Sequence, residues 1–443
     1  MGIGGIGLSA LAGILAAQGN KLSGSDKETS KLTNKLAEYG VTVFEGHKAT
    51  NIGKNTDLVI YSLAIPATNP ELVEAKRLNI PTLTYPQALG ELTKNFYTIA
   101  ICGTHGKSTT TALIAKTLIE NNFDPTVIVG TKISELDGQN FRVGQSKILV
   151  IEACEYRRAF LNYSPKIIVM HTVEPDHMDY FKDFEDYALA FEQFAQKLPQ
   201  DGYLFGNLDE EKIHNIIQTR LAKKFPPNNI FTYSKDFSRS DFYLSKSDIY
   251  HRDLKLGTLN MKIPGKHNRI NALAAFAVCN TFGIVPKDII HSLNNYHGAF
   301  RRFEVKGKLG RTIIIDDYAH HPTEIMATLS GARELFPDKK VCVVFQPHQY
   351  SRTKKLLTGF ASAFSDADMV IIPNIYEVRD SEEDKKAITA ESLVEELKKN
   401  HTNVIFGEGF EKTTEYLRKN AHKFDVIFTM GAGDVWKIGE NLL

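Results

Sequence analysis

The chain has 443 residues, 42% of them hydrophobic and 24% charged, which is the balance of an ordinary globular protein long enough for about three domains. It contains 53 Lys and Arg residues and 52 Asp and Glu residues, so the formal net charge is +1. Dedicated nucleic-acid and membrane-surface binders usually have a strong basic excess, so neither nucleic acid nor a membrane is expected as a partner.

The cysteines and the hydropathy of the chain indicate a cytoplasmic protein. No two of the four cysteines form a CxxC pair, which argues against a disulfide framework and against a zinc site. They are Cys102, Cys154, Cys279 and Cys342. Residues 1–20 lack the basic start of a signal peptide, and no apolar run reaches the roughly 18 to 20 residues of a membrane span.

Short β-branched runs alternate with amphipathic stretches along the chain, a pattern typical of α/β units around parallel sheets. The predicted strands lie at 58–60, 98–101, 148–151, 167–170, 312–315, 341–345, 369–372 and 426–429. The predicted helices lie at 109–121, 268–281, 323–335, 354–365 and 389–399. Strand–loop–helix units restart near 94–97 and near 298–302. We therefore expect three domains, at residues 1–95, 96–299 and 300–443.

The first motif is a glycine-rich loop at residues 2–7. It has the spacing G-x-G-x-x-G, and its bare backbone amides suit a pyrophosphate. Its glycines are Gly2, Gly4, Gly5 and Gly7. Asp26 lies about 20 residues further on, as in NAD-binding domains, so NAD stays open at this point. Such a loop normally follows a strand, but Met1 directly precedes Gly2, and we expect the natural start to lie upstream.

The second motif spans residues 98–112 (TIAICGTHGKSTTTA), an apolar strand, a glycine loop and a helix of small residues. It is a shortened form of the phosphate loop G-x-x-x-x-G-K-[ST], because Ile101 stands where the first glycine belongs. Backbone amides and the helix dipole would cradle ATP phosphates, with Lys107 on the β/γ-phosphates and Ser108 on Mg²⁺. The loop residues are Gly103, Thr104, His105, Gly106, Lys107, Ser108 and Thr109.

Two further polar residues, Glu152 and His177, each follow a predicted strand. The carboxyl ends of parallel strands meet at one edge of a sheet, where ligands gather in open α/β folds. A carboxylate and an imidazole beside ATP can hold Mg²⁺. A single His is more often structural, but the pair Asp176-His177 after the end of a strand favours a metal site here.

Three later segments place polar side chains at the start of a helix or at a domain boundary. Asn268 opens the predicted helix 268–281, where helix capping is the alternative to a ligand contact. Arg302 lies at the second boundary, where an exposed basic pair is the alternative. Residues 316–322 (DDYAHHP) place two Asp and two His after a strand, and taken alone they suggest a metal site.

Together these motifs resemble those of the Mur ligases, the ATP-dependent amide-forming enzymes of peptidoglycan precursor synthesis. The resemblance covers almost the whole chain in the family's order. Its segments are residues 2–7, 103–110, 152–155, 174–177, 265–271, 301–304, 316–322, 346–348 and 431–434. It implies three α/β domains: a Rossmann-like UDP-binding domain, a central P-loop-like ATPase domain and a C-terminal Rossmann-like domain. It also implies that L-alanine is joined to UDP-N-acetylmuramate with the use of ATP.

The resemblance implies a role for each motif. The glycine loop at residues 2–7 holds the diphosphate of the UDP-sugar. Glu152 binds Mg²⁺ near the γ-phosphate, and His177 binds a second ion. Asn268 and Asn271 recognise adenine.

In the C-terminal domain the resemblance places Arg302 on the γ-phosphate and Asp317 on the ATP ribose. The residues facing the amino acid and the muramyl carboxylate are His320, His348 and Arg352. Three positions depart from the family, which usually has Asp, Asn and Arg there. They are Cys154, Thr172 and Gln349.

Some sibling ligases use a carbamylated lysine shortly after the histidine. Residues 183–196 contain no lysine, so we expect a carboxylate or water to substitute and activity to be independent of dissolved CO₂. Three other functions stay open: a ligase that recycles murein tripeptide, an NAD-dependent oxidoreductase, which leaves the Lys107 loop unexplained, and an inactive binding relative. The sequence leaves monomer and weak dimer open.

Overall fold

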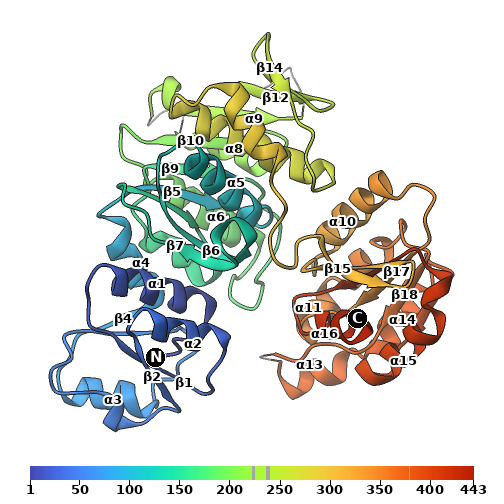
Figure 1. The fold of residues 1–443 in the computed structure, drawn as a ribbon, viewed down its shortest axis with the longest axis horizontal. Helices are drawn as coiled ribbons and strands as arrows, with labels where there is room; N and C mark the ends of the chain where they lie inside the picture. The colour runs from blue at the N-terminus through green and yellow to red at the C-terminus, as the bar shows by residue number, and fades with distance from the viewer. Residues whose placement is uncertain (222–224, 236–239, 379) are drawn as a thin grey trace. The chain divides into compact units, whose positions relative to one another are not determined.

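The computed structural model describes residues 1–221, 225–235, 240–378 and 380–443, and these form two compact units (Figure 1). The first unit consists of Met1–Asn260 and Ile270–Tyr296. The second consists of Met261–Arg269 and His297–Leu443. Within the described ranges, no helix is both long enough and apolar enough to cross a membrane.

The first unit begins with two small parallel sheets, β1–β2 and β3–β4. Its opening elements are α1 (Ile6–Ala17), β1 (Ser23–Asp26), α2 (Lys31–Glu38), β2 (Thr42–Glu45), β3 (Val59–Tyr61), α3 (Pro70–Arg77), β4 (Thr82–Thr84) and α4 (Tyr85–Thr93). The N–H groups of Gly2 and Ile3 donate to the Ser25 carbonyl at 2.8 and 3.1 Å, and Ser62 N–H donates to the Met1 carbonyl at 3.1 Å. Residues 1–3, which include the start of the glycine loop, therefore link the two small sheets by hydrogen bonds.

A ten-stranded sheet forms the rest of the first unit, in the order β14-β13-β12-β11-β10-β9-β5-β8-β6-β7. Its strands are β5 (Tyr97–Cys102), β6 (Thr126–Ile133), β7 (Gln139–Arg142), β8 (Ile148–Glu152), β9 (Ile167–Met170), β10 (Tyr203–Asn207), β11 (Ile230–Ser234), β12 (Phe242–Ser245), β13 (Asp248–His251) and β14 (Leu254–Thr258). The helices are α5 (Lys107–Glu120), α6 (Phe184–Ala195), α7 (Glu211–Ile216), α8 (Lys266–Thr281) and α9 (Pro286–Asn294). Helix α8 begins in the part of the chain assigned to the second unit.

The central strands of this sheet are buried on both faces. Strand β5 lies between β8 and β9 and is parallel to both. Ile99, Val150 and Ile168, one on each strand, have no exposed surface. Strands covered on both faces read as continuous apolar runs, which is why the sequence predicted all three. Helix α1 shares this core, because Leu11 and Ile14 belong to the same cluster of buried side chains.

The second unit is a six-stranded sheet in the order β15-β16-β20-β17-β18-β19, antiparallel only at β15. Its strands are β15 (Glu304–Leu309), β16 (Thr312–Asp317), β17 (Val341–Phe345), β18 (Met369–Ile372), β19 (Val404–Phe406) and β20 (Val426–Met430). The helices are α10 (Pro322–Leu335), α11 (Tyr350–Lys355), α12 (Leu357–Ser362), α13 (Glu382–Ala387), α14 (Ala390–Leu397), α15 (Phe410–Asn420) and α16 (Trp436–Leu442).

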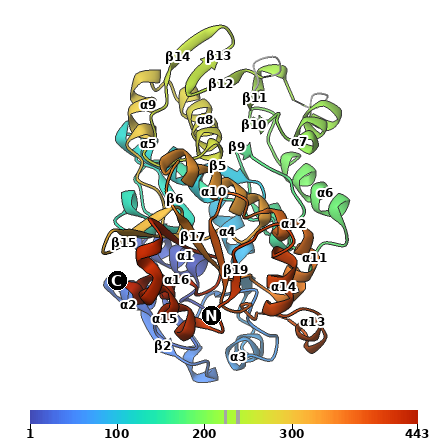
Figure 2. The same cartoon turned by 90° about the vertical axis from the view of Figure 1, so that its right-hand side faces the viewer.

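Side chains alternate between two cores on the two faces of this sheet. On β17, Val343 packs with α10, α12 and α14, while Cys342 and Val344 pack with α15 and α16. In Figure 2, α12 and α14 lie on one side of this unit and α15 and α16 on the other. One predicted helix is wrong in form: 354–365 is split into α11 and α12, because Leu356 leaves the helical conformation with φ −100° and ψ 9°.

Candidate functional site

Three neighbouring strands end at one edge of the large sheet and carry the predicted phosphate site. Strand β5 runs into the phosphate loop and α5, β8 ends at Glu152, and β9 is followed by His171 and His177. Because β5 lies between β8 and β9, the phosphate loop has the carboxylate-bearing strand on one side and the histidine-bearing strand on the other. The strand order therefore brings together predicted site residues that are spread over 75 positions of the sequence, from Gly103 to His177.

Glycine is required in the phosphate loop for its backbone conformation and for space. Gly103 and Gly106 have φ values of +138° and +84°, in the left-handed region. A Cβ at Gly106 would lie 2.5 Å from Asn271 Oδ1. Helix α5 begins at Lys107, so the first N–H groups of the helix have no partner within it and are available to an anion.

Thr172 holds the loop against the segment after β9. Thr104 N–H donates to the Thr172 carbonyl at 2.8 Å, and His105 N–H donates to Thr172 Oγ1 at 2.8 Å. His105 Nε2 lies 3.4 Å from Glu174 Oε2. A departure from the family pattern at position 172 thus still supplies a side-chain oxygen that fixes the loop.

The Lys107 ammonium group lies inside the loop. It donates to the carbonyls of Gly103 and, at 3.1 Å, of Thr104, and its Nζ lies 3.1 Å from Glu155 Oε2. Burial lowers the pKa of Lys107, but the nearby acidic groups, Glu155 first among them, together more than offset this, and the pKa is raised above its usual value. Lys107 is therefore charged at neutral pH, as a phosphate ligand must be.

The carboxylate of Glu152 fits a cation. Its Oε1 atom is buried and has no hydrogen-bond partner among the described residues, which is costly unless a ligand compensates. Glu152 is an oxygen donor of the kind that Mg²⁺ prefers. His177 Nε2 lies 3.6 Å from Glu155 Oε1 and 3.7 Å from Asp176 Oδ2, in an acidic environment.

His171 is a buried residue at the site that the sequence analysis missed. It is 1% exposed, and its Nδ1 lies 2.8 Å from the Tyr233 hydroxyl. Burial, and then the charge of Lys107, lower the pKa of His171 to about 3. His171 directly follows the apolar run of β9, and a histidine at such a strand end was the available signal.

The two asparagines predicted to recognise adenine lie on α8. Asn268 is not the helix cap considered from the sequence, because its side-chain amide donates to the Pro264 carbonyl at 2.6 Å. Asn271 is 6% exposed and faces Gly106 of the phosphate loop. Asn271 is thus positioned directly against the loop.

In the second unit, Asp317 is held by the backbone around it. It is 5% exposed and accepts hydrogen bonds from Phe303 N–H at 2.7 Å and Ala319 N–H at 2.8 Å. Burial raises the pKa of Asp317 to about 6, although Arg302 opposes the shift. Asp316 instead accepts a hydrogen bond from the Arg301 side chain, Nε to Oδ2, at 2.6 Å, so both aspartates are engaged by the fold rather than gathered around an ion.

The residues predicted to face the amino acid follow β16 and β17. His320 Nδ1 lies 3.1 Å from Glu324 Oε2, and the His320 and His348 rings are 6.3 Å apart. His348 stacks on Tyr376 with ring centroids 5.3 Å apart. Arg352 lies on α11, one helical turn after Gln349.

Gln349 itself is buried. It is 5% exposed, has a φ of +71°, and donates from Nε2 to the Val378 carbonyl at 3.2 Å. The side chain is therefore engaged by its own domain.

The glycine loop at residues 2–7 is closed by Asp26. Gly4 N–H donates to Asp26 Oδ2 at 2.8 Å, and Gly5 N–H donates to the Gly2 carbonyl at 3.1 Å. Gly7 packs against Tyr85, whose ring would lie 2.6 Å from an added Cβ. Asp26 thus bonds the loop itself, whereas in an NAD-binding domain this acidic residue bonds the ribose.

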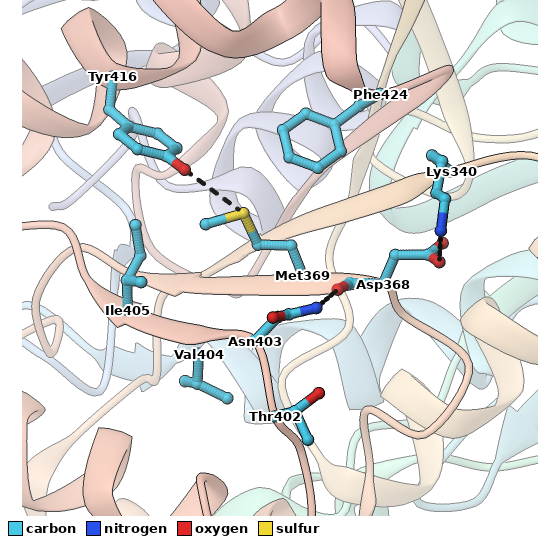
Figure 3. Close-up of a pocket in the computed structure, with 9 residues that line it drawn as sticks. All are labelled: Lys340, Asp368, Met369, Thr402, Asn403, Val404, Ile405, Tyr416 and Phe424. Carbon is cyan, nitrogen blue, oxygen red and sulfur yellow. Dashed lines mark hydrogen bonds and ion pairs between the residues drawn. The ribbon is translucent and has the colours of Figure 1, made fainter.

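A cavity of about 400 Å³ lies elsewhere in the second unit (Figure 3). It opens where β18 and β19 begin, at Met369 and Val404, and the Tyr416 hydroxyl lies 3.7 Å from Met369 Sδ. Asp317 and His348 instead follow the carboxyl ends of β16 and β17. The cavity is therefore at the opposite edge of the sheet from the predicted site residues.

Family models match three consecutive parts of the chain. The Mur ligase family catalytic domain matches residues 1–97, the Mur ligase middle domain residues 101–279, and the Mur ligase glutamate ligase domain residues 301–433. The chain belongs to the Mur ligase family. As a Mur ligase it is an ATP-dependent ligase, which agrees with the phosphate loop.

Curated relatives match this Mur ligase over its full length. It is 40% identical over 449 aligned residues to the UDP-N-acetylmuramate–L-alanine ligase of Acetivibrio thermocellus, covering 100% of this chain and 94% of the relative. It is 39% identical over 448 residues to the enzyme of the same name from Clostridium beijerinckii, covering 100% and 96%.

Solved structures confirm the predicted fold of three α/β domains. The UDP-N-acetylmuramate–alanine ligase of Thermotoga maritima matches with a TM-score of 0.81 and 26% identity, covering 100% of this chain and 96% of that one. A murein peptide ligase from Psychrobacter arcticus matches with a TM-score of 0.71 and 22% identity, covering 100% and 96%, which shows a shared fold.

Proposed function

We propose that this Mur ligase joins L-alanine to UDP-N-acetylmuramate and converts ATP to ADP and phosphate, a cytoplasmic step of peptidoglycan precursor synthesis. The observation that carries the proposal is the identity of about 40% over the full chain to curated enzymes of that name. The phosphate loop between Glu152 and His177 supports it independently.

In the proposed reaction the lactyl carboxylate of the UDP-sugar attacks the γ-phosphate, and ADP leaves as an acyl phosphate forms. The alanine amine then attacks the acyl carbon, phosphate leaves, and the amine loses a proton. Lys107 and Arg302 neutralise charge on the transferring phosphoryl oxygens, which phosphoryl transfer requires. Lys107 suits this role because it stays charged within the loop.

We assign Mg²⁺ binding to Ser108 and Glu152, with His177 on a second ion. The buried, unpartnered Oε1 of Glu152, judged among the described residues, supports the assignment. When bound, the metal supplies positive charge to the phosphate oxygens.

The other assignments follow the order of the domains, at residues 1–95, 96–299 and 300–443. The glycine loop at residues 2–7 takes the UDP diphosphate, and Asn268 and Asn271 take adenine. In the last domain, Asp317 binds the ATP ribose. The amino acid and the muramyl carboxylate are bound by His320, His348 and Arg352.

Phosphate release from ATP tests the proposal. The purified protein is assayed with UDP-N-acetylmuramate and, in turn, L-alanine, L-serine, glycine and murein tripeptide. We expect release to require the UDP-sugar and to be fastest with L-alanine. A preference for tripeptide would favour a recycling ligase, and no release with any acceptor would contradict the proposed function.

A further inference from the structure

The lysine of the phosphate loop already has partners within the protein. Lys107 Nζ lies 3.1 and 3.3 Å from the two carboxylate oxygens of Glu155, and it also donates to the carbonyls of Gly103 and Thr104. An ammonium group has three N–H donors. The loop and Glu155 engage all three, so a phosphate oxygen can bind Lys107 only by replacing one of these acceptors.

Glu155 is held in place from several sides. Its side chain is 1% exposed and lies shortly after the end of β8. The Tyr187 hydroxyl on α6 donates to Glu155 Oε1 at 3.4 Å and lies 2.9 Å from Thr104 Oγ1. A buried carboxylate is tolerated only when it is paired. Lys107 is the nearer of two basic partners of Glu155 at 3.1 Å, and His177 Nε2 lies 3.6 Å from Glu155 Oε1.

Two anions therefore compete for one ammonium group. The triphosphate of ATP needs Lys107, and the Glu155 carboxylate already holds it. When the Lys107 ammonium group moves from Glu155 to a phosphate, the Glu155 carboxylate keeps its negative charge close to the phosphates. This repulsion opposes ATP binding. Neither the motif roles nor the family resemblance gave Glu155 a function.

We propose that Glu155 is a positioning residue that holds Lys107 when no nucleotide is bound and is replaced by the ATP phosphates. Glu155 keeps the empty loop in order and at the same time lowers the affinity for ATP. The proposal rests on the proposed function only in that Lys107 binds ATP phosphates. It is independent of which amino acid is joined.

Glu155→Gln tests this directly, because it keeps the size and an acceptor oxygen but removes the charge. In EDTA, where no metal contributes, we expect ATP to bind on the order of tenfold more tightly than to the wild type. Without nucleotide the variant should have a lower Tm, and saturating ATP should shrink that difference. Calorimetric titration and thermal unfolding of the full chain measure both effects.

Asp179→Asn is the matched control. It removes the same charge from an exposed side chain that accepts from the Tyr156 hydroxyl at 3.2 Å, and ATP affinity should stay within about twofold. Unchanged or weaker ATP binding by Glu155→Gln overturns the proposal, as does an equal gain in the control. A wild type that binds no ATP would contradict the proposed function instead.

If Glu155→Gln does not fold, a second pair of variants tests whether Lys107 and Glu155 stabilise each other. Lys107→Met leaves a buried, unpaired carboxylate, whereas Lys107→Met combined with Glu155→Gln removes both charges. The double variant should therefore have the higher Tm of the two. A double variant no more stable than Lys107→Met overturns the proposal.

Discussion

Arg301 and Arg302 are adjacent but differ in burial. Arg301 is 6% exposed, and its guanidinium donates to Asp316 at 2.6 Å and to the carbonyls of Gly431 and Gly433 at 2.6 and 2.8 Å. The Arg302 side chain is 33% exposed and lies 3.9 Å from Glu324. Burial thus separates a structural arginine from one that is accessible to a ligand.

The two arginines should respond differently to substitution. Arg301→Ala leaves a buried carboxylate unpaired, and we expect it to destabilise the second unit by about 3–5 kcal/mol. Arg302→Ala should leave the Tm nearly unchanged. It should lower kcat on the order of 100-fold, because it removes a positive charge that would stabilise the transferring phosphoryl group. Thermal unfolding and steady-state kinetics of both variants test this, and a wild-type Tm for Arg301→Ala would contradict it.

His171 makes stability depend on pH. Its pKa in the folded protein is about 3, whereas an unfolded histidine titrates near pH 6.5. Only the unfolded chain takes up this proton as the pH falls from 6.5 towards 3, so the folded state loses about 1.4 kcal/mol per pH unit from this group. We expect His171→Gln to lose less stability than the wild type between pH 7 and pH 5. Denaturant unfolding at both pH values measures the difference, and equal losses would refute it.

At the scale of elements, α1 packs directly on the large sheet. A Cβ at Gly13 would overlap the ring of Phe141 on β7, so a side chain at position 13 would have to displace that ring. The Asn140 side chain next to it donates to the Ile6 carbonyl at the start of α1. The glycine loop at residues 2–7 is therefore anchored through the helix that follows it.

Gly13→Ala should consequently weaken UDP-N-acetylmuramate binding and lower the Tm. Overpacking of a tight core contact costs roughly 1–3 kcal/mol. A smaller partner, Phe141→Leu, should restore part of both losses when combined with Gly13→Ala. Calorimetric titration with the UDP-sugar measures the effect, and a single variant with wild-type affinity and Tm would show that the contact does not matter.

Helix α6 covers the segment in which some sibling ligases have a carbamylated lysine. Glu185 is paired with Lys212, Asp186 accepts from Arg158, and the residue of α6 that reaches Glu155 is Tyr187. No α6 lysine is present to be modified. We expect turnover in CO₂-depleted buffer to equal turnover with added bicarbonate, and an increase on addition would contradict this.

At the scale of the molecule, the proposed sites for nucleotide and UDP-sugar lie on different segments. Lys107 belongs to the loop after β5, whereas the UDP-sugar loop lies before α1. Lys107→Ala should therefore abolish acyl-phosphate formation and leave the Kd of UDP-N-acetylmuramate nearly unchanged. Phosphate release and calorimetric titration separate the two, and wild-type turnover would remove this loop from the mechanism.

Much of the fold was predictable from local pattern. The central strands read as apolar runs because they are buried on both faces, and the phosphate loop was recognised because its glycines have a conformation that few other residues adopt. The break at Leu356 was missed, since the amphipathic pattern of 354–365 continues across it. The closure of the loop at residues 2–7 by Asp26 was also missed, because the same spacing suits a ribose contact.

The sequence by itself determined the α/β class, the phosphate loop and the membership of the family, because periodicity, glycine conformation and motif order are local properties of the chain. Only the tertiary structure decided the partners of the charged groups. Lys107 and Glu155 are 48 positions apart, and Arg301 and Gly433 are 132 positions apart. Such pairs form because particular strands become neighbours in a sheet. Burial then makes each pairing strong, since an unpaired charge away from water is too costly to keep.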